Sequence, residues 1–159
     1  MSDTLVLRGA TPADAPAIAA TIAAAFEQYR GQLAPESGAF RETAEAIANE
    51  LASDSGAIVA ERNGRMLGCV MVKLLEGDLY FGRLSVLPDA RGQGLAKRLI
   101  EAVEDEARRR ELAGVRCGVR IVLIENQRLF TSLGYLEIGR EAHEGFDHST
   151  SINLRKALG

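Results

Sequence analysis

The stretch from Leu79 to Ile100 constrains the fold more than any other, because a strand pattern in it changes directly into a helix pattern. Its first part, up to Leu87, is rich in leucine, β-branched and aromatic residues, and Pro88 closes it as a strand is often closed. An amphipathic pattern with helical spacing then begins near Ala96. The sequence therefore predicts a strand, a short loop and a helix.

The loop in this stretch, Arg91 to Ala96, has glycines at 92 and 94 where the helix begins. Small residues let a ligand approach the backbone, and the first helical N–H groups have no partner inside the helix. Such amides can point together at an anion, so the loop predicts a phosphate cradle. It fits neither standard nucleotide loop, because the Walker spacing is absent and GxGxxG would need a glycine in place of Lys97.

The bulk composition narrows the class of protein. The chain has 159 residues, 47% of them hydrophobic, which predicts one domain over residues 1–159. A formal charge of −3 argues against a nucleic-acid partner, and no run of Lys or Arg suggests an anionic membrane partner. There is no apolar run of about 20 residues and no signal-peptide core in residues 1–10, so we expect a cytoplasmic protein.

The two cysteines and two histidines do not predict a metal site. Cys69 and Cys117 stand alone, and only His143 and His148 are available to join them. We expect no metal, and both cysteines as small buried apolar residues.

The remaining chain predicts an α+β domain with a mixed, mostly antiparallel sheet of six to seven strands and about four helices. Asn63-Gly64 predicts a tight hairpin, and Thr11-Pro12 a helix start. Glu104, Asp105 and Glu106 each precede an arginine by four residues, which predicts a solvated face of ion pairs. The expected strands are 4–8, 57–62, 65–75, 79–87, 115–123, 135–141 and 150–155, and the expected helices are 11–31, 44–51, 96–110 and 126–133.

Two motifs resemble those of the GCN5-related N-acetyltransferase (GNAT) family. Leu84, Val86 and Pro88, followed by Arg91, Gly94 and Ala96, resemble its L-x-V-x-P strand end and its R/Q-x-x-G-x-G/A loop. The segment Phe130-x-x-Leu133-Gly134-Tyr135 resembles its Y-x-x-L-G-F/Y helix end. The resemblance covers nearly the whole chain and implies the acyl-CoA N-acyltransferase fold, with acetyl-CoA as co-substrate and no metal.

The resemblance also implies which residues bind coenzyme A. Backbone amides of the loop would hold the pyrophosphate, and the preceding strand would offer main-chain groups to the pantetheine arm. Arg91 and Arg98 would add charge at the phosphates or be merely exposed, and Asn126 would contact the pantetheine or cap a helix. The implied cofactor-binding residues are Leu84, Ser85, Val86, Arg91, Gly92, Gln93, Gly94, Leu95, Ala96, Asn126 and Phe130.

The catalytic groups are less well specified. An N–H near Val86 can polarise the thioester carbonyl, and Asp78 is a candidate base, although Glu76-Gly77-Asp78 is also ordinary turn chemistry. The family's usual tyrosine acid is replaced by Phe130, which has no proton to give. A free thiol has a pKa of about 8.5, so water or Asn126 can assist the departing thiolate.

The acceptor site is expected to be lined by the loop between the first two helices, the central strands and the loop between the last two strands. Its arginines suit a carboxylate or phosphate on the substrate, and His143 is either a second candidate base or a solvated loop residue. The candidate residues are Tyr29, Arg30, Tyr80, Arg83, Arg120 and His143.

Three functions stay open at this point. The first is an N-acetyltransferase acting on an amine of a small molecule or peptide, the second an acyl-CoA sensor of the same fold with weak or no catalysis, and the third a generic nucleotide site. The sequence leaves both a monomer and a homodimer open.

Overall fold

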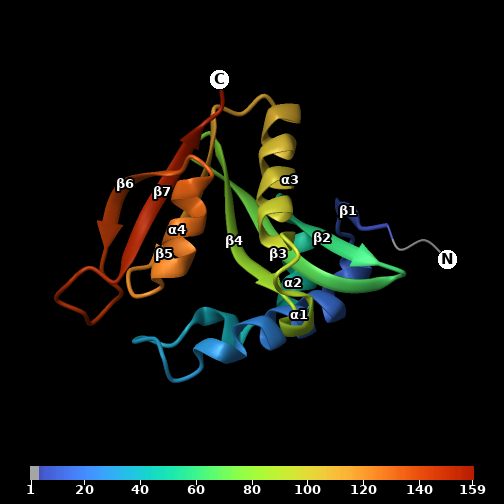
Figure 1. The fold of residues 1–159 in the computed structure, drawn as a ribbon, viewed down its shortest axis with the longest axis horizontal. Helices are drawn as coiled ribbons and strands as arrows, with labels where there is room; N and C mark the ends of the chain where they lie inside the picture. The colour runs from blue at the N-terminus through green and yellow to red at the C-terminus, as the bar shows by residue number, and fades with distance from the viewer. Residues whose placement is uncertain (1–3) are drawn as a thin grey trace.

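The computed structural model describes residues 4–159 and contains one seven-stranded sheet with helices on both faces (Figure 1). The strand order is β1-β2-β3-β4-β5-β7-β6. The strands are β1 (Val6–Gly9), β2 (Gly56–Arg62), β3 (Arg65–Leu75), β4 (Asp78–Val86), β5 (Gly114–Arg120), β6 (Leu136–Glu141) and β7 (Ser151–Ala157). The helices are α1 (Ala15–Phe26), α2 (Ala44–Leu51), α3 (Leu95–Arg109) and α4 (Ile124–Ser132), with 3-10 turns at Pro12–Asp14, Glu27–Tyr29, Gly38–Arg41 and Pro88–Ala90.

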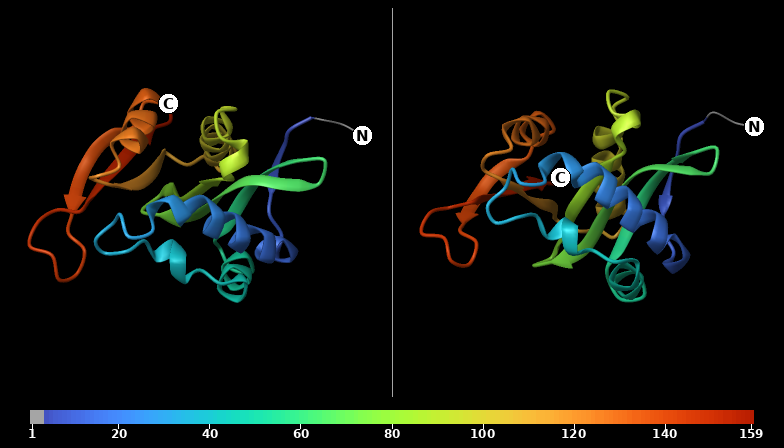
Figure 2. Two further views of the ribbon diagram at one scale, coloured as in Figure 1. Left: turned by 60° about the horizontal axis from the view of Figure 1, so that its bottom comes forward. Right: turned by 90° about the horizontal axis from the view of Figure 1, so that it is seen from below.

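The sheet separates two hydrophobic cores, which gives a three-layer α+β architecture. One core, which includes Leu99 and Phe130, joins α3 and α4 to the sheet, and the other, which includes Ile18 and Ile47, joins α1 and α2 to it. Figure 2 shows α1 and α2 lying across the opposite side of the sheet from α3. Cys69 and Cys117 are buried in these cores, as predicted, and burial raises the pKa of each thiol to about 12. The predicted fold class is confirmed.

The expected elements are present, with shifted ends. Asn63 and Gly64 both take positive φ and join β2 to β3, because a two-residue hairpin turn requires that conformation. The strand predicted over 115–123 ends at Arg120, and the short helix predicted from Asn126 begins at Ile124. No helix among residues 4–159 is long and apolar enough to cross a bilayer.

The prediction that Glu104 lies on a solvated face of α3 is wrong. This side chain is only 6% exposed, accepts a hydrogen bond from the Tyr135 hydroxyl at 2.8 Å, and contacts Lys156 Nζ at 3.2 Å. Ile100, Val103, Glu104 and Ala107 share one helix face, so Glu104 turns toward the sheet. The exposed neighbours pair among themselves, mostly three rather than four residues apart: Asp105 with Arg108, and Glu106 with Arg109 and Arg110.

The strands β4 and β5 pair over only part of their length. They are the parallel neighbours in the sheet, joined by the α3 crossover, and their register runs only from Leu79–Val115 to Phe81–Cys117. Beyond that point β4 continues to Val86 and β5 to Arg120 without pairing to each other. The two halves of the sheet therefore part, as Figures 1 and 2 show.

A β-bulge accompanies this parting. Opposite β3, Ser85 pairs with Cys69 and Gly82 with Met71, so Arg83 and Leu84 together face Val70. Arg83 takes a left-handed conformation with φ of 54°. Because a bulge bends its strand and increases the local twist, it turns the second half of β4 away from β5.

Candidate functional site

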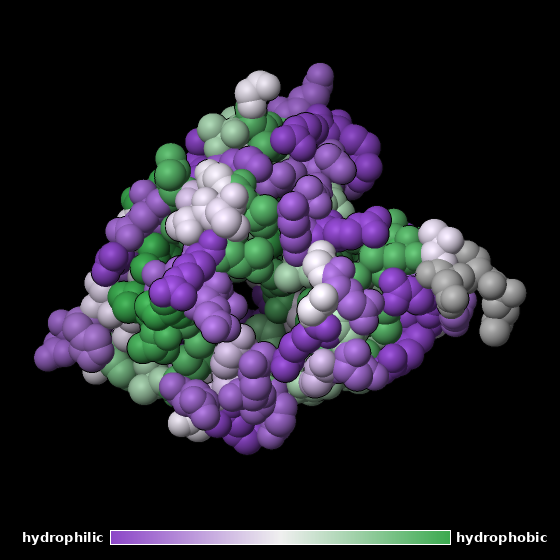
Figure 3. Space-filling model, viewed as in Figure 1, coloured by the Kyte–Doolittle hydropathy of each residue, from purple (hydrophilic) through white to green (hydrophobic). Residues whose placement is uncertain are grey.

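The parting of β4 and β5 opens into a cavity of about 800 Å³. Its walls come from the end of α1, residues 28–41, the start of α3, α4, and the ends of β4, β5, β6 and β7. Figure 3 shows the surface hollowed near the centre of this view. We refer to this cavity as the central cleft.

The loop before α3 meets the central cleft with unpaired amides. Gly92 and Gly94 have φ of 82° and 75°, and the first α-helical hydrogen bond joins Arg98 N–H to the Gly94 carbonyl at 3.1 Å. Within residues 4–159, no group accepts a hydrogen bond from the amides of residues 92–97. A Cβ atom at either glycine would meet nothing within 4 Å, so the amides lie beside open space at the positive end of a helix dipole. This arrangement fits a diphosphate.

A backbone donor of β4 also faces the gap. Leu87 N–H donates to the Leu67 carbonyl at 2.9 Å, which makes Leu67–Leu87 a hydrogen-bonded pair across β3 and β4. In an antiparallel ladder the next pair, Gly68–Val86, is a non-hydrogen-bonded one. The Val86 N–H consequently points away from β3, toward the gap where β5 has separated.

A family model describes the same region of the chain. The model of the Acetyltransferase (GNAT) family matches residues 21–135, which is more than half of the sequence. The chain belongs to the GNAT acetyltransferase family. The family resemblance predicted from the loop and from the Phe130–Tyr135 segment is thus confirmed.

Solved structures of other GNAT proteins share the fold. The ribosomal-protein-S18-alanine N-acetyltransferase of Escherichia coli is 19% identical, with a TM-score of 0.79 over 97% of this chain and 94% of the other. The PaiA N-acetyltransferase of Thermoplasma acidophilum, solved in complex with coenzyme A, is 15% identical, with a TM-score of 0.80 over 98% and 99%. A putative acyl-CoA N-acyltransferase of Klebsiella pneumoniae is 24% identical, with a TM-score of 0.73 over 99% and 100%. No curated protein sequence matches this chain.

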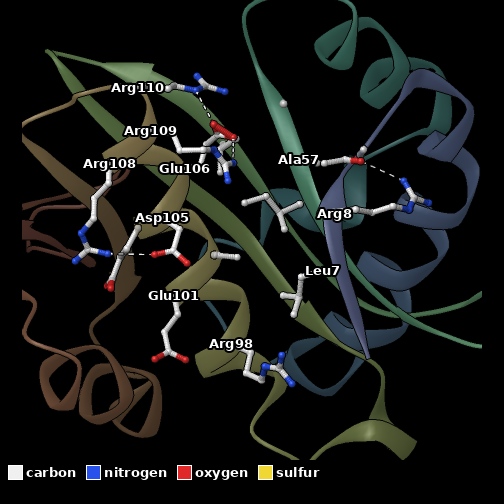
Figure 4. A pocket seen from close by; sticks show the side chains of 17 residues that line it. Leu7, Arg8, Ala57, Arg98, Glu101, Asp105, Glu106, Arg108, Arg109 and Arg110 are labelled. Carbon is white, nitrogen blue, oxygen red and sulfur yellow. Dashed lines mark hydrogen bonds and ion pairs between the residues drawn. The ribbon is translucent and has the colours of Figure 1, made fainter. Parts of the chain in front are cut away.

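A second cavity of about 800 Å³ lies on the outer face of α3, beside β1 and β2 (Figure 4). Leu7, Ile58 and Val72 contribute apolar lining, and charged side chains of α3 stand along one wall. Three arginines of that wall, at 108–110, are paired with Asp105 or Glu106 of the same helix. The free amides and the Val86 N–H belong to the central cleft instead, so the central cleft is the candidate active site of this GNAT protein.

The structure places Asp78 outside the central cleft. Its side chain is 2% exposed, and Oδ2 accepts a hydrogen bond from Arg155 Nε at 2.7 Å as well as one from Arg116 Nε. The hydrogen bonds from Arg155 and Arg116 hold the pKa of this carboxyl below its usual value. A buried carboxylate held by two guanidinium groups is a poor proton acceptor, so the hypothesis that Asp78 is the general base is corrected: it ties β4 to β5 and β7.

Most of the other predicted residues line the central cleft, and a few do not. Arg30 is exposed and pairs with Glu27, Gln93 accepts a hydrogen bond from Arg62, and the buried Ser85 donates to the Arg83 carbonyl. Arg98 lines the second cavity. The predicted residues that line the cleft are Tyr29, Tyr80, Arg83, Leu84, Val86, Arg91, Gly92, Gly94, Leu95, Ala96, Arg120, Asn126, Phe130 and His143.

Two of these lining residues have definite partners. Arg91 Nη2 donates to the Ala25 carbonyl at 3.1 Å, so its guanidinium ties the cradle to the end of α1. Asn126 Nδ2 lies 3.5 Å from the Tyr29 hydroxyl. Because α4 begins at Ile124 with Leu123 as its N-cap, the alternative that Asn126 caps this helix is wrong.

Phe130 is buried at 6% exposure, and its ring packs edge-on against Phe81 and Tyr135. The Tyr135 hydroxyl is held by Glu104 and is buried away from the cleft. The Tyr80 hydroxyl lies 3.5 Å from the place that a Cβ atom at Gly118 would take, and 4.0 Å from that at Gly82. Tyr80 therefore reaches across from β4 to β5, close to the last paired residues of the two strands.

Several residues that line the central cleft were not predicted from the sequence. Ser151 and Asn153 alternate with the buried Ile152 and Leu154, so the period of two along β7 carries a signal for them. Arg41, Glu36 and Glu141 lie in or beside irregular segments, where no periodicity distinguishes a cleft residue from a solvated one.

Asp78→Asn is expected to lower the free energy of unfolding at pH 7 by about 3 kcal/mol, because it leaves two guanidinium groups without their buried counter-ion. The depressed pKa means that this stabilisation is present above the unfolded carboxyl's pKa of about 3.9 and is lost as the pH falls toward the folded value. Urea unfolding at pH 7 and at pH 3 measures both effects.

Glu76→Gln is the matched control, because Glu76 also pairs with Arg116 but is 69% exposed, and its change is expected to stay within about 0.5 kcal/mol. The folded Asp78→Asn protein should keep its turnover per molecule. Unchanged stability together with lost turnover would restore Asp78 as the base.

Proposed function

We propose that this protein is an acetyl-CoA-dependent N-acetyltransferase that transfers an acetyl group directly to a primary amine of a small molecule or a peptide. The observation that supports this proposal most is the arrangement of donors in the central cleft, which has the free amides of residues 92–97 at one end and the Val86 N–H along its wall. Family membership and the fold shared with a coenzyme A complex support the same function.

The residues divide the central cleft into three parts. The cradle before α3, with Lys97 on the same wall, would hold the diphosphate. The gap between β4 and β5 would take the pantetheine arm, with Leu84, Val86 and Asn126 along it. The far end, near β5, β7 and residues 36–41, would hold the acceptor.

Acetyl-CoA supplies an acetyl thioester, whose carbon–sulfur bond breaks as the carbon–nitrogen bond to the amine forms. The Val86 N–H is a fixed donor that can stabilise negative charge on the carbonyl oxygen, in the manner of an oxyanion hole. The cleft narrows where β4 and β5 pair, and Tyr80 stands at that place.

We assign to Tyr80 the protonation of the departing sulfur, a role that Phe130 cannot fill. Its hydroxyl has no hydrogen-bond partner within residues 4–159, and burial raises the pKa of the phenol above its usual value. The group is therefore protonated at neutral pH and available as a donor.

His143 suits the role of base better than Asp78. It lines the cleft, its backbone N–H donates to the Thr150 hydroxyl at 2.9 Å, and its Nδ1 contacts the same hydroxyl. Burial and the nearby Arg120 charge lower the pKa of the imidazole. A neutral imidazole at physiological pH can accept the proton that the amine loses.

Gly94→Glu is expected to abolish coenzyme A binding, because a carboxylate would then stand where the diphosphate is bound. Calorimetric titration with coenzyme A measures the loss. Gly145→Glu is the matched control: Gly145 also has positive φ with open space around it, but it lies in the β6–β7 connection, so affinity should be unchanged. Retained affinity in Gly94→Glu would show that the cradle is assigned to the wrong segment.

Tyr80→Phe is expected to lower kcat by about 100-fold, the lower end of the range for loss of general acid catalysis, with little change in coenzyme A affinity. Phe130→Tyr in that background should recover part of the loss, because it places a phenol at the position usual for the family. Stopped assays of thiol release give kcat for the three forms. A Tyr80→Phe protein with wild-type kcat would exclude Tyr80 as the donor.

The alternative function is an acyl-CoA-binding sensor, and Phe130 is the observation that favours it. Thiol release with amino acids, polyamines, aminoglycosides and peptides separates the two functions. Tight acetyl-CoA binding with no turnover across all four classes would contradict the enzymatic proposal and support the sensor.

A further inference from the structure

We propose that the acceptor carries an anionic group, a carboxylate or a phosphate, and that Arg41, Arg83 and Arg120 bind it at the far end of the central cleft. This inference rests on the proposed function and names the class of amine that the site selects. The three side chains come from separate segments: the 3-10 turn at Gly38–Arg41, the β4 bulge and the end of β5.

Two of the guanidinium groups converge on one point. The place that a Cβ atom at Gly38 would take is 2.6 Å from Arg83 Nη2 and 3.3 Å from Arg41 Nη2. A side chain at residue 38 would displace the Arg83 guanidinium from this position. Two cationic guanidinium groups that approach one point repel each other, so an anion that bridges the two groups would stabilise this arrangement.

Arg120 adds a third charge to the same region. It is half-buried, and its hydrogen bond to protein is a long one of 3.4 Å from Nη2 to the Glu36 carbonyl oxygen. Burial and the neighbouring Arg83 lower the pKa of its guanidinium. Arg120 is thus partly desolvated and close to another cation, a situation that a bound carboxylate or phosphate relieves.

The acidic side chains nearby neutralise this cluster only in part. Glu42 pairs with Arg83 through one contact of 3.2 Å. The Glu36 carboxylate is close enough to act on Arg120 but accepts the Gly31 amide at 3.1 Å. Within the described part of the chain, neither Arg41 nor Arg120 has a carboxylate within ion-pair distance.

Another acidic side chain, Glu141, lines the cleft beyond Arg120. Arg120 pairs with Ser151 across β5 and β7, and Ser151 pairs with Glu141 across β7 and β6. Two strand spacings, about 10 Å, thus separate Arg120 from Glu141 on one face. Glu141 acts electrostatically on both Tyr80 and His143, as Arg83 does on Tyr80 and Arg120 on His143, so charges of both signs lie close to the proposed catalytic groups. An amine that also carries a carboxylate or a phosphate would find a partner for each of its charges there.

The test compares amines that differ only in the anionic group: glycine with glycinamide, a peptide acid with its amide, and phosphoethanolamine with ethanolamine, with spermidine as a cationic amine. Wild-type protein should use at least one anionic member with a KM about 10- to 100-fold below that of its neutral partner. Arg120→Gln and Arg83→Gln should remove that preference by raising KM, with kcat little changed. Calorimetric binding of the preferred amine in the absence of acetyl-CoA should show the same loss of affinity.

Arg30→Gln is the control, because Arg30 is exposed, pairs with Glu27 and does not line the cleft. Arg120→Lys should restore part of the affinity, as a point charge without the guanidinium fork. Equal use of charged and neutral partners, or preference for spermidine, with coenzyme A binding intact, would overturn the inference and leave the proposed function standing. Failure of the wild-type protein to bind coenzyme A would overturn the proposed function itself.

Discussion

The separation of β4 from β5 is the constraint on which the rest of this structure depends. A parallel pair that stayed together to Val86 would bury its backbone groups in the ladder and leave no room for an extended ligand. Here the pairing ends at Phe81 and Cys117, while a bulge at Arg83 turns β4 aside. The same bulge aims Arg83 at Gly38, so a single backbone irregularity shapes both the gap and the acceptor end of the cleft.

Ion pairs hold the strands together at the closed end of the gap between β4 and β5. The buried Asp78, at the start of β4, is bound by the half-buried Arg116 of β5 and Arg155 of β7, and these ion pairs link three strands at the end where they remain paired. The open end has no such link and is lined by the free amides before α3 and the N–H of Val86. The strands therefore separate only at the end where hydrogen bonds to a ligand can replace those that β4 and β5 would otherwise make with each other.

Local signals were enough to predict the fold and the glycine-rich turn before α3. Asn63-Gly64, the proline at 88 and the glycines at 92 and 94 act through the backbone conformation that each residue permits, which neighbours hardly alter. Glu104 and Asp78 were misassigned because their partners, Tyr135, Lys156 and Arg155, are distant in the sequence. A charged residue on a helix or at a turn is ordinarily solvated, and only the tertiary fold reveals a buried counter-ion. For the same reason Arg41 gave no signal: its role depends on Gly38 and on Arg83 from another segment.

We infer that main-chain amides at one end of the central cleft and along β4 bind the ligand. Amide resonances of 15N-labelled protein, followed during titration with coenzyme A, test it most directly. We expect the amides of residues 92–97 and of Val86 to show the largest shifts and to gain protection from hydrogen exchange. Shifts confined to residues around the second cavity, such as Arg8 and Arg109, with the residues 92–97 unaffected, would contradict it.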